Sequence, residues 1–155
     1  MIKTRRSFLQ FAGGVCAMAA LGAAGLLRTA VARAATWNKA GFDAKAFADA
    51  MKAIGATGAA ESKDIVITAP DIAENGAVVP VEVTSRISGT ESISIVAEKN
   101  PFPLVATVDL SNGSEPYTYV RIKMGQTSDV YAVVKAGGKV FTARKEIKIT
   151  VGGCG

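Results

Sequence analysis

Residues 79–83, with the sequence VPVEV, decide the fold class, because valine alternates with residues of other kinds. A period of two places the three valines on one face of a β-strand and leaves the other face to solvent. Similar alternation recurs in residues 118–124 and 146–151. Strands with one buried face are typical of antiparallel sheets. Pro80 cannot donate a ladder hydrogen bond, so we expect its strand to be an edge strand or to carry a bulge there.

Outward from this stretch, residues 64–151 form a series of such runs separated by turn signals. The expected strands are residues 64–69, 77–85, 91–99, 103–110, 117–124, 128–136 and 139–151. The turns contain residue pairs with glycine that supply positive φ angles: Asn75-Gly76, Asn112-Gly113 and Gly137-Gly138. Because no helical pattern interrupts these runs, the sequence predicts a mainly β fold, an immunoglobulin-like antiparallel β-sandwich.

A helix is expected before the first strand. Apolar side chains recur there at helical spacing: Phe42, Ala46, Phe47, Ala50, Met51 and Ile54. Gly55 is expected to end the helix. We expect the apolar stripe to pack against the body of the sandwich.

Residues 1–34 have the features of an export signal. Paired arginines stand in the segment TRRSFLQ at residues 4–10, a mildly apolar run follows to Leu27, and Ala32-Arg33-Ala34 offers a cleavage site. The run is marginal for spanning a bilayer, and an uncleaved anchor is the alternative. We predict a cleaved twin-arginine signal. The exported protein would then start near Ala35 in the periplasm, without a membrane attachment.

The charge balance differs between the leader and the rest of the chain. Lys and Arg number 18 and Asp and Glu 13 over the whole chain, but the leader holds five basic residues and no acidic one. The remainder therefore has 13 residues of each sign, which removes the main support for nucleic-acid binding.

The chain has no histidine. That excludes Ser-His-Asp and Cys-His catalysis and histidine-ligated metals.

The one cysteine beyond the leader is Cys154, with Gly152 and Gly153 before it and Gly155 after it. Glycines provide no apolar side chain to anchor the segment and have large backbone entropy. We therefore predict a folded domain over residues 35–151 and a flexible arm over residues 152–155 with an exposed thiol. Such an arm reaches about 14 Å from the last strand.

The chemistry of this thiol favours a carrier over an enzyme. A free cysteine is only a few per cent thiolate at neutral pH, and no neighbouring side chain in the segment would activate Cys154. It is a handle for covalent attachment, and no cofactor is expected. The alternative is a structural module whose Cys154 links two chains by a disulfide. A metal-binding sandwich is the weakest hypothesis, since Cys154, Met and carboxylates would be its only ligands.

Partner surfaces are harder to locate in the sequence. Pro101-Phe102-Pro103 is a stiff apolar kink that is either a partner contact or a corner of the sandwich. The uncharged strand positions Tyr131 and Val133 are further candidates.

Taken together, these residues resemble the SoxY family, the sulfur-carrier subunit of the periplasmic thiosulfate-oxidising system. The similarity lies in the twin-arginine leader, the small β-rich body and the terminal GGCG of residues 152–155. Residues 74–81 (ENGAVVPV) and 100–104 (NPFPL) are also similar to SoxY sequences. The resemblance implies a non-enzymatic carrier that pairs with a SoxZ-like subunit and holds oxidised sulfur intermediates on Cys154. It also implies cytochrome, hydrolase and dehydrogenase partners that load, trim and oxidise this cargo.

Overall fold

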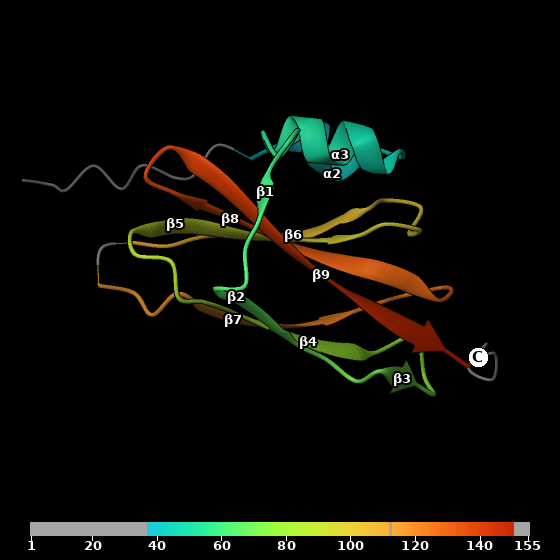
Figure 1. Cartoon of the computed structure of the whole chain (residues 1–155). Coiled ribbons are helices and arrows are strands. Elements are labelled where there is room, and N and C mark those ends of the chain that lie inside the picture. Colours follow the sequence, from blue (N-terminus) through green and yellow to red (C-terminus); the bar gives the residue numbers. More distant parts are fainter. Residues whose placement is uncertain (1–36, 112, 151–155) are drawn as a thin grey trace, which may run out of the picture. The chain divides into compact units, whose positions relative to one another are not determined.

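The structure is a computed structural model that describes residues 37–111 and 113–150. Strands dominate it, and two short helices precede them (Figure 1). The helices are α2 (Lys39–Asp43) and α3 (Phe47–Ala53). The strands are β1 (Ala60–Glu61), β2 (Ile65–Thr68), β3 (Ile72–Ala73), β4 (Val79–Ser85), β5 (Thr90–Ala97), β6 (Leu104–Asp109), β7 (Tyr117–Ile122), β8 (Ser128–Ala136) and β9 (Lys139–Ile149). The expected immunoglobulin-like sandwich is confirmed, and each of the seven expected strands is present.

The described strands form two sheets. One has the order β1-β9-β8-β5-β6, with β3 added beside the end of β9, and the other has the order β2-β4-β7. The long neighbours are antiparallel, as predicted, whereas β1 and β3 each pair with β9 in parallel. These two strands were not predicted, because two residues are too few to show an alternating pattern.

The main core lies between the two sheets and explains the VPVEV pattern. Val79, Val81 and Val83 are fully buried and belong to one apolar cluster with residues of the facing sheet, among them Ile93 and Val130. The alternation therefore identified the buried face correctly.

The position of Pro80 also follows from the sheet order. Strand β4 is central where β2 pairs with it, from Glu82 to Ser85. At Pro80 the only described neighbour is β7, through Arg121. Pro80 thus lies on a stretch where one side of β4 is an edge, which agrees with the expectation.

A second apolar cluster joins the helices to the outer face of the larger sheet. Ala50 and Ile54 pack there with Val96, Leu104 and Val133. The predicted stripe therefore does pack against the body, but the prediction of one continuous helix is wrong. The chain is extended at Ala44 and Ala46, with ψ of 130° and 140°, which separates α2 from α3.

The end of α3 agrees with the prediction. Gly55 has φ of 71°, which favours glycine. The Gly55 N–H donates to Lys52 O and the Ala56 N–H to Met51 O, so the last helical carbonyls are satisfied. Within the two described ranges, no helix is long and apolar enough to cross a membrane.

The strand registers define two ends of the sandwich. The exit end is where β9 finishes at Ile149, together with loops 74–78, 98–103 and 123–127. The far end consists of turns 86–89 and 137–138 and of residues 113–116. In Figure 1 the exit end is on the right, where β9 ends beside β3.

Candidate functional site at the end of strand β9

The predicted site residues lie outside the described residues. These are the thiol-bearing Cys154 and the arm residues Gly152, Gly153 and Gly155. The structure instead places the segment from which they extend, since Thr150 is the last described residue and stands four positions before Cys154.

The end of β9 is hydrogen-bonded up to this last residue. The Ile149 N–H donates to Thr127 Oγ1 at 3.0 Å, and the Thr150 N–H donates to Ala73 O at 3.2 Å. Two residues earlier, the Lys148 N–H donates to Asp71 O at 2.9 Å. The backbone is therefore fixed from two sides at the point where the predicted arm begins.

Gly76 packs directly against this point. A Cβ at Gly76 would be 2.3 Å from Met124 O and 3.0 Å from Ile149 Cγ2, and the Met124 N–H donates to Gly76 O at 2.7 Å. The expectation that Gly76 supplies a positive φ is wrong, whereas Gly113, Gly137 and Gly138 do have one. Glycine is needed at residue 76 for close approach of two backbones.

Lys145 links the segment before β3 to β9. Its Nζ lies 3.0 Å from Asp71 Oδ1 and donates to Ala69 O at 2.6 Å. Because the Asp71 side chain is largely exposed, the ion pair is a minor contribution. The bond to Ala69 O adds a second fixed point beside the end of β9.

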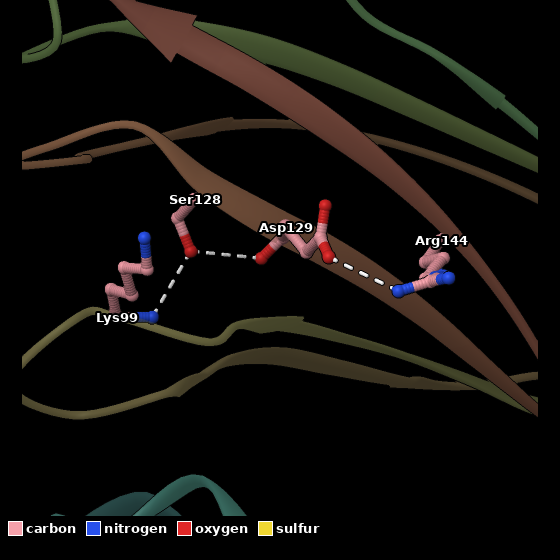
Figure 2. A network of polar contacts seen from close by, with 4 residues as sticks. All are labelled: Lys99, Ser128, Asp129 and Arg144. Atoms are coloured by element: carbon pink, nitrogen blue, oxygen red, sulfur yellow. Dashed lines mark hydrogen bonds and ion pairs between the residues drawn. The ribbon is translucent and has the colours of Figure 1, made fainter.

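A polar network ties the β5–β6 loop to the start of β8 (Figure 2). The Lys99 N–H donates to Ser128 Oγ at 3.0 Å, and the Ser128 hydroxyl donates to Asp129 O at 3.0 Å. Asp129 Oδ2 lies 3.4 Å from Arg144 Nη1 on β9. Hydrogen bonding to Tyr131, and then the charge of Asp129, raise the pKa of Arg144. The network gives loop 98–103 a fixed position.

The Pro101-Phe102-Pro103 kink belongs to this fixed loop. The Asn100 Nδ2 donates to Lys123 O at 2.7 Å, which joins loops 98–103 and 123–127. Pro103 is buried and Phe102 is exposed. The kink is thus a corner of the sandwich that also presents an aromatic side chain to solvent.

Three large apolar side chains are more than half exposed at the exit end: Ile72 at 57%, Val78 at 51% and Phe102 at 52%. The sequence pointed to Phe102 alone. The VPVEV alternation could have identified Val78, because an inward Val79 leaves its neighbour facing out. Ile72 lies in no alternating pattern that could have identified it as exposed.

One of the two predicted strand positions for a partner is wrong, and the other is half-buried. Val133 is 1% exposed and lies in the cluster under the helices. Tyr131 packs against Phe47, with ring centroids 4.8 Å apart. Val133 is therefore covered, whereas Tyr131 is half-buried beside helix α3.

Other candidate sites in the described chain are weaker. Over residues 37–111 and 113–150, no three His, Cys, Asp or Glu side chains are grouped so as to hold a metal. An open hollow of about 450 Å³ lies at the far end, lined by residues 85–91 and by Leu110, Ser111, Gly113, Ser114 and Pro116. The hydroxyls of Ser85 and Thr90 in its wall bond to each other at 2.8 Å, and Thr90 also donates to Ile87 O. They are therefore engaged within the protein.

Comparisons with known proteins extend these observations. The chain is similar to a solved "sulfur carrier protein SoxY" from Chlorobium limicola f thiosulfatophilum, with 44% identity and a TM-score of 0.55, over 59% of this chain and 83% of that one. A variant of the superoxide reductase (neelaredoxin) from Ignicoccus hospitalis matches with a TM-score of 0.50 and 23% identity, over 59% of this chain and 83% of that one. This second likeness concerns the fold alone.

The comparison with curated proteins gave no match. A family model described as "Sulfur oxidation protein SoxY" matches residues 50–154, from helix α3 to the terminal cysteine. The chain therefore belongs to the SoxY family.

Proposed function

We propose that this protein is a periplasmic carrier that holds thiosulfate-derived sulfur covalently on Cys154 and presents it to the enzymes of sulfur oxidation. The observation that carries the proposal is the end of β9, which is hydrogen-bonded up to Thr150 only four residues before the thiol. A rigid body followed by Gly152 and Gly153 suits a carrier whose end enters other proteins' active sites. Membership of the SoxY family supports this function.

The chemistry of loading requires a partner. Joining the terminal sulfur of thiosulfate to the Cys154 sulfur forms an S–S bond and releases the thiol proton and two electrons. A cytochrome component would accept these electrons. Hydrolysis of the adduct then releases sulfate and leaves a persulfide on Cys154, and a dehydrogenase component would oxidise the remaining sulfur. The carrier itself supplies the attachment point and does no catalysis.

The location and the assembly are part of the same proposal. Residues 1–34 would direct export by the twin-arginine route and be cleaved near Ala35. In the periplasm the domain would pair with a SoxZ-like subunit. Neither nucleic acid nor a membrane would bind the exported protein.

Intact-mass spectrometry without reductant tests the function. The full-length protein is exported, purified and incubated with thiosulfate and its cognate oxidising components. We expect additions that reductant removes and that map to Cys154, and no addition on Cys154→Ser. A matched control is Cys154→Ser combined with Ser88→Cys, which presents an exposed thiol in the far-end turn. This thiol should remain unloaded.

Other outcomes would contradict the proposal. Equal loading of the thiol at residue 88 would show that any exposed cysteine suffices. A mass of two chains with no sulfur addition would favour the structural module linked through Cys154. Normal thiosulfate turnover by Cys154→Ser would exclude the carrier role altogether.

A further inference from the structure

The reach of the arm limits where an enzyme can meet the carrier. Thr150 is held by Ala73 O, and Ile149 by Thr127 Oγ1. Four residues beyond Thr150 span at most about 14 Å when fully extended. An enzyme that reacts with Cys154 must therefore bring its own surface close to the exit end of the domain.

Two large apolar side chains are exposed on the segments beside the end of β9. Ile72 is paired in register with Lys148, one residue before Ile149. Val78 follows Gly76, which packs on Ile149. Both side chains are more than half exposed. Both residues therefore belong to segments that contact the last residues of β9.

The backbone that carries these side chains is held in place before any partner arrives. Ile72 belongs to β3, where Asp71 and Ala73 on either side of it accept bonds from β9 and Thr150. The Val78 N–H donates to Asn75 O, in a loop fixed by the bond between Gly76 and Met124. A surface that is already ordered binds without the entropy cost of ordering it.

The charges nearby have both signs. Lys145 is paired with Asp71, exposed Glu74 and Lys148 have opposite signs, and exposed Lys123 precedes Met124, which bonds to Gly76. Beyond the leader the chain has 13 basic and 13 acidic residues. Apolar contact is the interaction that the exposed side chains of Ile72 and Val78 offer.

We propose that Ile72 and Val78 form a docking surface for the enzymes that act on Cys154, and that it contacts an apolar rim around the cleft which admits the arm. This inference rests on the proposed carrier function. Docking through the domain sets the affinity for the enzyme, and the arm then delivers the sulfur to the reacting groups. Carriers with and without this surface would share kcat and differ in KM.

The test measures the rate of loading of Cys154 as a function of carrier concentration, with thiosulfate and the purified cognate oxidising components. Ile72→Ser and Val78→Ser should each raise KM for the carrier on the order of tenfold with kcat unchanged. Tyr117→Ser is the matched control, because Tyr117 is an exposed large side chain beside the far end. It should leave KM unchanged. Since all three side chains are exposed, the variants should keep the melting temperature of the original protein.

A peptide of residues 151–155, acetylated at its N-terminus, separates this inference from the carrier function. We expect the peptide to load with a much lower kcat/KM than the whole protein. Equal loading of peptide and protein would overturn the docking surface and leave Cys154 as the carrier site. Failure of both to load would instead overturn the carrier function.

Other occupants of the surface give different results. If a second copy of the chain covers Ile72 and Val78, the serine variants would dissociate a dimer in sedimentation with KM unchanged. If residues 151–155 fold back on it, the same variants would lower KM. Either result would overturn the proposal.

Discussion

The two ends of the sandwich use glycine for different reasons. At the far end, Gly89, Gly137 and Gly138 have φ of 70°, 54° and 72°, and a Cβ on any of them would meet nothing within 4 Å. At the exit end, Gly76 lacks a positive φ, and a Cβ there would meet Met124 O at 2.3 Å. The far-end glycines set the direction of turns, whereas Gly76 allows two backbones to touch.

The ends also differ in what their surfaces present. The far end has an open hollow lined by polar and apolar residues, among them Ile87 and Leu110, and the hydroxyls of Ser85 and Thr90 in its wall bond to each other. The exit end is cross-linked by bonds between loops and exposes Ile72, Val78 and Phe102. A rigid apolar surface is costly to keep in water unless something covers it in function. Bonds between loops and exposed apolar side chains thus occur together at the end where β9 finishes.

The largest effect that tests this comparison is expected for Gly76→Ala. The added methyl group would clash with Met124 O, which is backbone and cannot rotate away, so the free energy of unfolding should fall by about 3 kcal/mol. Denaturant unfolding measures it. The matched control is Gly125→Ala at the same end, where nothing lies within 4 Å. Gly125→Ala should change stability by less than about 0.5 kcal/mol.

An equal, small loss of unfolding free energy for Gly76→Ala and Gly125→Ala would show that the exit end repacks freely. That result would remove the structural contrast between the two ends.

Gly137→Ala, at the far end, should have a smaller effect. The clash there is within the residue's own backbone at positive φ, which costs about 1 kcal/mol. Gly137→Asn should cost less than half of that, because asparagine tolerates the left-handed region and is favoured in such hairpins. Thermal and denaturant unfolding of the two variants would show whether Gly137→Ala loses more stability than Gly137→Asn. A larger loss for asparagine than for alanine would mean that steric contact, and not φ, constrains the far end.

The smallest effect is expected when the salt concentration is changed and the affinity for a partner enzyme is followed. Because the charges beyond the leader balance and the docking surface is apolar, the affinity for a partner enzyme should change by no more than about twofold between roughly 50 and 200 mM salt. Loading kinetics at several salt concentrations measure this. A steep decrease would show that local charges at the exit end carry the contact.

The fold could be predicted from the sequence wherever a pattern was long enough to repeat. Strands such as β4 and β9 alternate over many residues, and each was predicted to within two residues at either end. The helix was predicted as one element because the apolar spacing continues across Ala44 and Ala46, although the chain is extended there. Backbone conformation at alanine leaves no mark in such a pattern.

The candidate site was predicted only in part for a similar reason. Cys154 and its glycines were identified from composition, and their role stays a prediction because they lie outside the described residues. The role of Gly76 depends on a contact with Met124, far along the chain, which no local pattern contains. Val133 was misjudged because an uncharged strand face has the same sequence pattern whether solvent or a helix covers it.

Strand β9 has a mechanical consequence for the carrier. It runs from the far-end turn to the base of the arm, pairs with β8 along most of its length, and has β3 beside its last residues. The ladder bonds lie across the strand, so a pull on the arm along the strand axis loads many of them in shear at once. An enzyme that draws the arm into its cleft would therefore meet a stiff anchor. The force would be spread over the sheet, and the last strand would not peel away one bond at a time.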